Sequence, residues 1–254
     1  MIMRKFKGLS ANTIKYIAIV LMTVDHVAFA FVNPNSVLYY LMRLLGRLTC
    51  PIMCYFIAEG FRYTRNKMKY LRRMTVFALI SQPIYFVMVF GRPPLSTWEF
   101  FTNWNVLYTF TVSLLMLLIM QSEKLSIRTK VILVTVAFAF ADFGDWGCVI
   151  SAWVLVFHLF RGNFKKQAVG FISVSLLLMT CKFLPAYESF MAFSYQYGVL
   201  LALVPLRLYS GERGDGRGKV MSVVNKWLFY LYYPTHMGVI ILAKIYLLKG
   251  GLSC

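Results

Sequence analysis

Ionisable residues lie inside the long apolar runs of this sequence, where each charged group is costly and is a functional candidate by default. Asp25 and His26 lie in the first run, Arg43 and Arg47 in the second, and His236 in the last. Histidine suits proton transfer near neutral pH, and arginine holds anions or stabilises developing oxyanion charge. These five residues are therefore the candidate catalytic residues.

The run boundaries place these side chains in one layer of a membrane. With a helical rise of ~1.5 Å per residue, Asp25, Arg43 and His236 each lie roughly 20 Å from the inner face. Successive residues of a helix diverge by ~100°, so Asp25 and His26 cannot point the same way. We therefore expect Asp25 to pair with an arginine and His26 to face a cavity. His236 either transfers a proton or satisfies a carbonyl freed by nearby Pro234.

Lys15 precedes His26 by eleven residues, which is about three helical turns or about 16 Å along one face. A ligand with an anionic head at the cytoplasmic surface and a reactive end deep in the bilayer would contact both residues. Snorkelling of Lys15 to the interface is the alternative. The basic segment after the second run extends this expected anion-binding mouth through Arg62, Arg65 and Lys69. An ion pair between Arg62 and Glu59 is expected beside it.

The composition indicates that transmembrane helices carry these residues. Of 254 residues, 59% are apolar and 14% are charged, and the mean hydropathy is +0.66; soluble domains carry roughly 25% charged residues. A bilayer-spanning helix needs ~20 mostly apolar residues. The sequence therefore predicts an all-α polytopic membrane protein with about nine transmembrane helices (range eight to ten), forming one integral-membrane domain over residues 1–254. The nine apolar runs are about 12–32, 36–61, 74–90, 103–120, 129–141, 147–160, 168–184, 190–207 and 222–248.

The basic residues behind the net charge of +18 lie in the pattern of a polytopic membrane protein, and they are not concentrated in one segment that could form a nucleic-acid groove. Twenty of the 27 basic residues fall in alternate connecting segments, namely residues 4–7, 62–73, 124–130, 161–166 and 207–226. This asymmetry predicts a cytoplasmic N-terminus. The lipid bilayer is thus an expected partner, and nucleic acid is not.

Familiar catalytic and binding motifs are absent from the sequence. It contains no serine nucleophile elbow, P-loop, dinucleotide fingerprint or metal-binding cluster, and its five cysteines form no CxxC pair. A general base, positive stabilisers and a basic mouth suit acyl transfer from a thioester, which needs no metal.

Short motifs along nearly the whole chain resemble the TraX family. They lie, in order, at residues 14–19, 22–26, 45–48 with Pro51, 56–61, 64–70 with Arg72 and Arg73, 80–83, 103–106 and 233–236. The resemblance implies a multi-pass protein of the bacterial inner membrane. The family takes its name from a conjugation protein that acetylates the N-terminus of F pilin.

The chain is also similar to the type-three membrane acyltransferases, which move acyl groups, often acetyl from acetyl-CoA, onto extracytoplasmic glycans. In those proteins a basic residue of the first helix is followed, after ten residues, by a histidine implicated in catalysis. Lys15 and His26 have this spacing, whereas Arg43 and Arg47 match the superfamily's arginine pair only loosely.

The resulting hypothesis is a membrane-bound acyltransferase that carries an acyl group, acetyl by preference, from cytoplasmic acyl-CoA to an amine or hydroxyl. The acceptor would be an extracytoplasmic pilin-like peptide or cell-envelope glycan. Two alternatives remain open: a proton-coupled transporter, and a non-catalytic pilus or envelope assembly factor.

Overall fold

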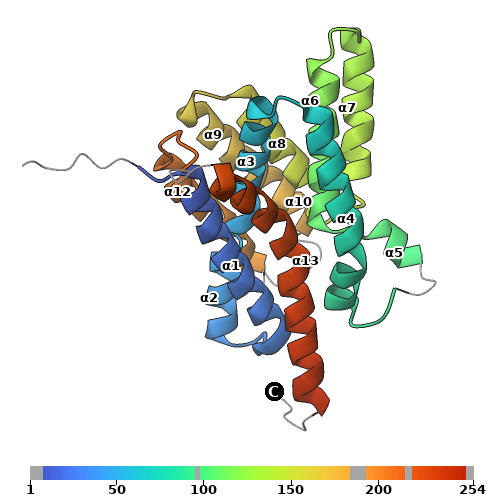
Figure 1. Ribbon diagram of the computed structural model, residues 1–254, viewed down its shortest axis with the longest axis vertical. Coiled ribbons are helices and arrows are strands. Elements are labelled where there is room, and N and C mark those ends of the chain that lie inside the picture. The colour runs from blue at the N-terminus through green and yellow to red at the C-terminus, as the bar shows by residue number, and fades with distance from the viewer. Residues whose placement is uncertain (1–7, 95–97, 184–192, 215–218, 250–254) are drawn as a thin grey trace, which may run out of the picture.

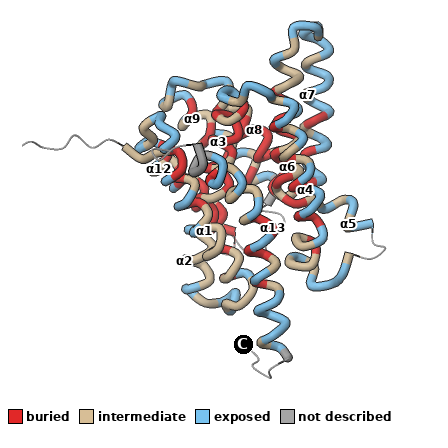
Figure 2. Tube along the Cα trace, viewed as in Figure 1, coloured by how far each residue is buried: buried red, intermediate tan, exposed pale blue. Residues whose placement is uncertain are grey.

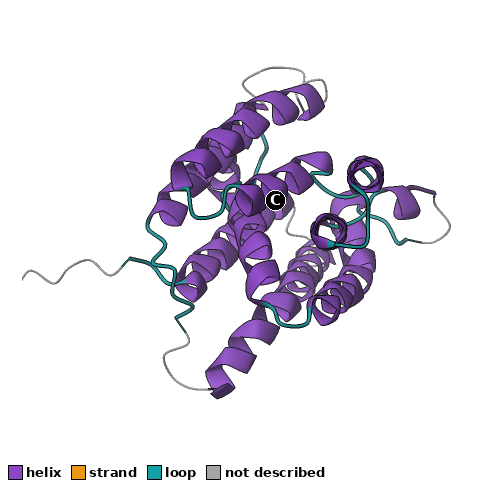
Figure 3. Ribbon diagram, turned by 90° about the horizontal axis from the view of Figure 1, so that it is seen from above, coloured by secondary structure: helices purple, strands orange, loops and turns teal. Residues whose placement is uncertain are grey.

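The structure is a computed structural model, which describes residues 8–94, 98–183, 193–214 and 219–249. Its described segments are helices joined by loops, with two isolated β-bridges and no strand (Figures 1 and 3). The helices are α1 (Ala11–Phe31), α2 (Val37–Gly46), α3 (Thr49–Tyr63), α4 (Lys67–Phe90), α5 (Trp98–Thr102), α6 (Val106–Gln121), α7 (Ile127–Ala141), α8 (Cys148–Leu159), α9 (Phe164–Val174), the π-helix η1 (Ser175–Met179), α10 (Thr180–Phe183), the 3-10 helix η3 (Tyr195–Ala202), α12 (Leu203–Arg207) and α13 (Lys219–Lys249).

Polar side chains mark where the helices begin. Ser10, Ser36 and Asn66 accept hydrogen bonds from backbone N–H groups in the first turns of α1, α2 and α4. Asn105, Ser126 and Asn163 do the same for α6, α7 and α9. Each cap satisfies an N–H group that has no partner inside the helix and contributes about 1 kcal/mol. These residues therefore set the starts of helices whose interiors are mostly apolar.

Each of the nine apolar runs coincides with helical structure among the described residues. Four segments are long and apolar enough to cross a membrane, namely Ala11–Phe31, Val37–Tyr63, Lys67–Phe90 and Val223–Leu248. Helices Val106–Gln121 and Cys148–Leu159 are apolar but shorter. The apolar helices indicate a membrane protein, while nine crossings and a cytoplasmic N-terminus stay predictions.

The second apolar run bends instead of forming one continuous helix. Helix α2 ends at Gly46 and α3 begins at Thr49, with Arg47 and Leu48 between them. Pro51 has no N–H group to donate to the carbonyl of Arg47, four residues earlier, and its ring crowds that carbonyl. The bend therefore falls at Arg47, one of the candidate catalytic residues.

Helix α8 lies at the centre of the molecule. It contacts α3, α6, α7 and α9, and its Trp153 side chain is fully buried. Figure 2 shows buried residues concentrated where these helices meet. One buried cluster runs from Cys50 in α3 to Met237 in α13. This rigid core supports the N-terminal part of α13 against α4 and the middle of α1.

The described basic segments meet at one end of the molecule. The backbone of residues 9–12 bonds to residues 208–213, and the Arg207 guanidinium lies over the ring of Phe164. Arg161 bonds to Tyr63 in α3, and Lys67 bonds to Gln121. These contacts connect three basic segments of the positive-inside pattern, 62–73, 161–166 and 207–226, with one another and with the start of α1. They also connect them with the end of α6, which precedes segment 124–130. Residues 4–7 and Arg217, which also belong to that pattern, lie outside the described residues.

Candidate functional site

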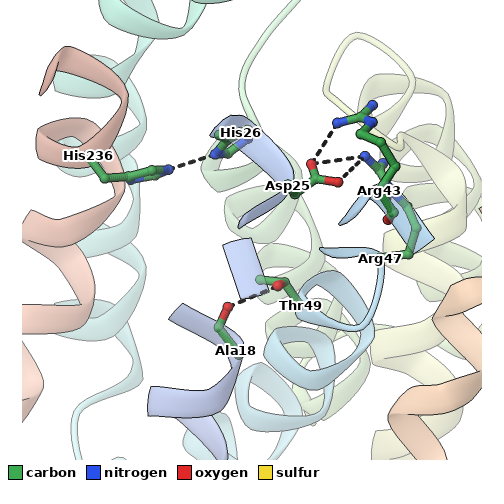
Figure 4. Close-up of polar contacts among 7 residues, drawn as sticks. All are labelled: Ala18, Asp25, His26, Arg43, Arg47, Thr49 and His236. Carbon is green, nitrogen blue, oxygen red and sulfur yellow. Dashed lines mark hydrogen bonds and ion pairs between the residues drawn. The ribbon is translucent and has the colours of Figure 1, made fainter. Parts of the chain in front are cut away.

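Asp25 pairs with an arginine, as the helical geometry predicted, and in fact binds both arginines of the second run. Its Oδ2 atom accepts from Arg43 Nη1 at 2.8 Å, and its Oδ1 atom accepts from Arg47 Nη2 at 2.7 Å (Figure 4). The three side chains are nearly buried. The bend before α3 keeps both guanidinium groups within reach of one carboxylate. Thr49 fixes the start of α3 by donating to the Ala18 carbonyl of α1 at 2.9 Å.

Aromatic rings surround the two guanidinium groups. The ring of Tyr195, at the start of η3, lies 5.5 Å from the Arg43 guanidinium and 5.6 Å from that of Arg47. Trp146 lies 5.3 Å from Arg47. Such contacts stabilise cations away from water. Sequence reasoning missed Tyr195 because one aromatic residue among many apolar ones gives no signal.

His26 meets His236 across the contact between α1 and α13. His26 Nδ1 and His236 Nε2 are 2.7 Å apart (Figure 4). His236 Nδ1 lies 2.7 Å from the carbonyl oxygen of Tyr232, one turn earlier in α13. The tyrosine ring stacks on His236 with a centroid distance of 5.1 Å. The expectation that the first and last runs bring these histidines together is confirmed. The carbonyl that His236 contacts is that of Tyr232, whereas the carbonyl that Pro234 leaves without its N–H partner is that of Tyr230.

An inner cavity of about 110 Å³ lies beside this cluster. Asp25, His26 and Arg47 line it, together with Cys50, Asp145 and Trp146. Neither Arg43 nor His236 is among its lining residues. The five candidate residues thus divide into three that reach the cavity and two that support them from behind.

Asp145 is a cavity residue that the sequence reasoning missed. It lies in the loop between α7 and α8, outside every apolar run, so the search for intramembrane charges passed over it. Burial raises the pKa of the Asp145 carboxyl to about 6, against the attraction of Arg47, which lowers that pKa. The sequence signal for a closely packed loop here is the pair of glycines, Gly144 and Gly147, on either side of Asp145. In the structure a Cβ on Gly144 would lie 2.1 Å from Thr109 Oγ1. Only glycine lets this loop pack so closely on α6.

An outer cavity of about 530 Å³ opens toward the basic end of the molecule. Its cationic lining residues are Lys15, Arg73, Arg213 and Lys226. Lys15 Nζ lies over the rings of Phe56 at 4.9 Å and Phe229 at 5.3 Å. Lys15 therefore points into the cavity between helices.

The two cavities adjoin one another. Four residues line both of them: Met53, Leu107, Phe110 and Phe229. A ligand passing between these four side chains would extend from the cationic outer cavity to His26. This is the arrangement that the spacing of Lys15 and His26 predicted.

Three residues expected at the basic mouth do not line the outer cavity. Arg62, Arg65 and Lys69 are exposed, and Arg73, one turn after Lys69, lines the cavity in their place. The sequence located the correct segment, but the faces of α3 and α4 were set by burial of Phe61, Tyr70 and Met74, which basic residues do not reveal.

The expected ion pair between Glu59 and Arg62 is replaced in the structure by a pair with another arginine. Glu59 Oε1 instead accepts from Arg161 Nε at 2.8 Å. This pair joins α3 to the loop after α8, while Arg62 points outward.

Comparison with known proteins identifies the family. A family model described as "TraX protein" matches residues 10–244. The chain belongs to the TraX family. The matched region contains every residue that lines either cavity.

The chain is similar to the "Probable fimbrial assembly protein FimC, serogroup H1" of Dichelobacter nodosus. It is 33% identical over 243 residues, which cover 94% of this chain and 97% of the relative. Its name describes fimbrial assembly. No solved structure matches the chain.

Proposed function

We propose that this TraX protein is a membrane-bound acyltransferase that moves an acyl group from acyl-CoA to an amine or hydroxyl of an extracytoplasmic acceptor. The observation that carries the proposal is the pair of adjoining cavities, one cationic and one ending at His26 and Arg47. The acceptor would be a pilin-like peptide or a cell-envelope glycan. The fimbrial assembly name of the relative supports a pilus-related acceptor.

The outer cavity suits the phosphorylated end of acyl-CoA. Lys15, Arg73, Arg213 and Lys226 supply positive charge, and phosphate groups bind arginine and lysine through charge-assisted hydrogen bonds. Aromatic residues such as Tyr63 and Phe229 share the lining and offer faces to a nucleobase. The linear arm that bears the thioester would pass between Met53 and Leu107 into the inner cavity.

In the inner cavity His26 would act as the general base. Its ring takes the proton from the acceptor hydroxyl or amine as the acceptor oxygen or nitrogen forms a bond to the thioester carbonyl carbon. The carbon–sulfur bond then breaks, and His26 returns the proton to the departing sulfur. Proton and electron pair are thus balanced without a metal or a further reactant.

Arg47 would stabilise the negative charge that develops on the thioester carbonyl oxygen. The Asp25 cluster contains one carboxylate and two guanidinium groups, so it carries one net positive charge, which Asp145 of the same cavity offsets only when its carboxyl is ionised. Because Arg47 lines the cavity and Arg43 does not, that charge is available on the cavity side. A fixed positive group in a site without water stabilises an oxyanion more strongly than it would in water.

The basic end would face the cytoplasm, where acyl-CoA is found, in a multi-pass protein of the bacterial inner membrane. The positive-inside distribution supports this orientation. Reporter fusions in the 122–126 and 32–36 loops would test it. A reporter at 122–126 that is active only outside the cytoplasm would contradict the proposal.

The first experiment measures acetyl-CoA binding and the slow release of CoA by the purified protein in detergent. We expect His26→Ala to lower CoA release about 100-fold, the scale of general-base catalysis, with binding unchanged. Absence of acetyl-CoA binding in a folded preparation of the wild-type protein would overturn the proposal.

A matched pair of variants tests the outer cavity. Arg73→Ala should weaken acetyl-CoA binding by about tenfold, equivalent to ~1.4 kcal/mol. Arg72→Ala removes the same charge from the neighbouring position, where the side chain is exposed and outside the cavity lining. Equal effects of the two substitutions would show that only general surface charge matters.

A non-catalytic role in fimbrial assembly is the second candidate, favoured by the name of the relative. In that case His26→Ala and Arg47→Gln would leave pilus assembly intact in cells. The acyltransferase proposal requires both variants to lose modification of the acceptor while the protein is still inserted in the membrane.

A further inference from the structure

The half-buried His26, the buried His236 and one backbone carbonyl form a continuous hydrogen-bonded chain. It runs from the Tyr232 carbonyl to His236 Nδ1, and from His236 Nε2 to His26 Nδ1, with both distances 2.7 Å. We propose that His236 is a positioning residue that holds the proton of His26 on Nδ1 and leaves Nε2 of His26 as the catalytic base. This inference rests on the proposed function for its kinetic consequence, but its structural content can be tested separately.

The direction of the chain follows from the carbonyl. A carbonyl oxygen only accepts hydrogen bonds, so His236 Nδ1 must carry a proton. In neutral His236 the other nitrogen, Nε2, then has a lone pair and accepts from His26 Nδ1–H. In neutral His26 the proton is thereby on Nδ1, and Nε2 is unprotonated. One backbone atom thus sets the tautomers of both rings.

The same chain favours His26 after it has taken a proton. Protonated His26 still donates from Nδ1 to His236 Nε2, so the hydrogen bond is kept and becomes charge-assisted. The carboxylate of Asp25 lies beside His26 in the cavity lining, and Arg43 and Arg47 partly offset its charge. On the other sides Asp145 and the hydroxyl-bearing rings of Tyr85 and Tyr233 line the same cavity.

His236 itself is placed to orient the base and not to exchange protons with a substrate. It is buried, with 6% of its surface exposed, and only His26 of the two lines the inner cavity. The stacked ring of Tyr232, tilted by 9° relative to His236, prevents rotation of the imidazole. Thr23 bonds to the hydroxyl of Tyr232 at 2.5 Å and holds that ring in turn.

The direct test is the protonation pattern of the histidine rings. The chain has three histidines, so ¹⁵N-labelled rings can be resolved by NMR in detergent and assigned with a His158→Gln variant. We expect neutral His26 to be in the Nδ1–H form in the wild type, and His236→Ala to remove this preference. A wild-type spectrum with the proton on Nε2 of His26 would overturn the inference whether or not the protein is an acyltransferase.

The kinetic test compares three variants in the CoA-release assay with acetyl-CoA. His236→Ala should lower kcat about 100-fold with an unchanged KM for acetyl-CoA, because the base loses its orientation. His236→Gln should restore kcat to within about tenfold of the wild type, since the Gln oxygen can accept from His26 where Nε2 did. A His236→Ala variant that keeps wild-type kcat would overturn the inference.

The control is Tyr16→Phe, which removes another side-chain hydrogen bond between α1 and α13, the one to Asn225, at a residue that lines neither cavity. If His236 served only to tie these helices together, Tyr16→Phe and His236→Ala would lower thermal stability and kcat alike. We expect Tyr16→Phe to reduce kcat less than about threefold, because it leaves the acid–base groups and their orientation intact. Absence of CoA release in the wild type would count against the acyltransferase proposal, while the NMR result would still decide the tautomer.

Discussion

At the scale of single residues, the site depends on one carboxylate, Asp25, that binds two guanidinium groups. Asp25 neutralises one positive charge of the Arg43–Arg47 pair and fixes both side chains. An unpaired guanidinium buried among the rings of Tyr195 and Trp146 would be far more costly than a paired one. Both guanidinium groups therefore depend on the single carboxylate of Asp25, and the cluster keeps one net positive charge in the protein interior.

Asp25→Asn is expected to destabilise the folded protein. It leaves two buried guanidinium groups with a neutral partner, and breaking a buried pair costs about 3–5 kcal/mol. The measurement is thermal unfolding of the purified protein in detergent. Glu99→Gln is the matched control, since it breaks an exposed ion pair with Arg92 and should cost about 0–1 kcal/mol. Similar shifts in unfolding temperature for both variants would contradict this view of the cluster.

Charged members of the site could be predicted because a charge inside an apolar run is rare. Asp25, His26, Arg43, Arg47 and His236 all stood out in this way. Cavity residues outside the runs could not be found by the same reasoning: Asp145 lies in a loop, and Arg73 lies in a segment, residues 62–73, that contains five other basic residues. Which face a helix turns inward depends on packing partners far away in the sequence.

At the scale of elements, close contact between α1 and α2 brings Asp25 to its arginines. Gly46 makes this contact possible, because a Cβ at that position would lie 2.3 Å from the Asp25 Cβ atom. The bend caused by Pro51 directly follows. A residue without a side chain and a residue without an N–H group thus jointly shape the arginine pair.

Gly46→Ala should separate the two helices and disturb the ion pairs of Asp25. We expect a loss of about 1–3 kcal/mol, typical of overpacking in a close-packed interior, with reduced CoA release. Gly238→Ala is the control, since no atom lies within 4 Å of an added Cβ there, and alanine in a helix is favoured over glycine by about 0.5–1 kcal/mol. Unfolding temperature and CoA release are the measurements. A Gly46→Ala protein as stable as the wild type would show that the contact can relax.

Apolar runs predicted where helices lie, but not how they are divided. The run over 36–61 is divided into two helices at Arg47 and Leu48, just before Pro51, and the run over 168–184 contains a π-helical turn at Ser175–Met179. Hydrophobicity reports only that a segment is buried or faces lipid. The division depends on local backbone hydrogen bonds and on packing, such as the bond from Trp153 to Ser175 at 3.1 Å.

At the scale of the whole molecule, the two cavities differ greatly in size. The outer cavity of about 530 Å³ leads to an inner one of about 110 Å³. A large head group can therefore enter only the outer cavity, while the inner cavity admits a narrow arm and a small group. The proposed enzyme should select its donor by the length of the acyl chain.

We expect acetyl-CoA to be used at least about tenfold faster than octanoyl-CoA, since each added methylene in a tight pocket is discriminated by about 10-fold or more. Met22→Ala enlarges the inner cavity and should bring the two rates closer together. Met116→Ala makes the same truncation in a buried cluster away from both cavities and should leave the preference unchanged. Rates of CoA release with each donor are the measurement. Equal rates in the wild type would refute the size limit.

The pairing of His26 with His236 spans 210 residues, and this has a consequence for biogenesis. When α1 leaves the ribosome and enters the membrane, its histidine has no partner, and almost the entire chain must be synthesised before α13 arrives. The start of α1 is likewise bonded to residues 208–213, which also emerge late. A nascent chain arrested before α13 would thus be inserted yet inert, and the proposed activity would begin only after α13 had been synthesised.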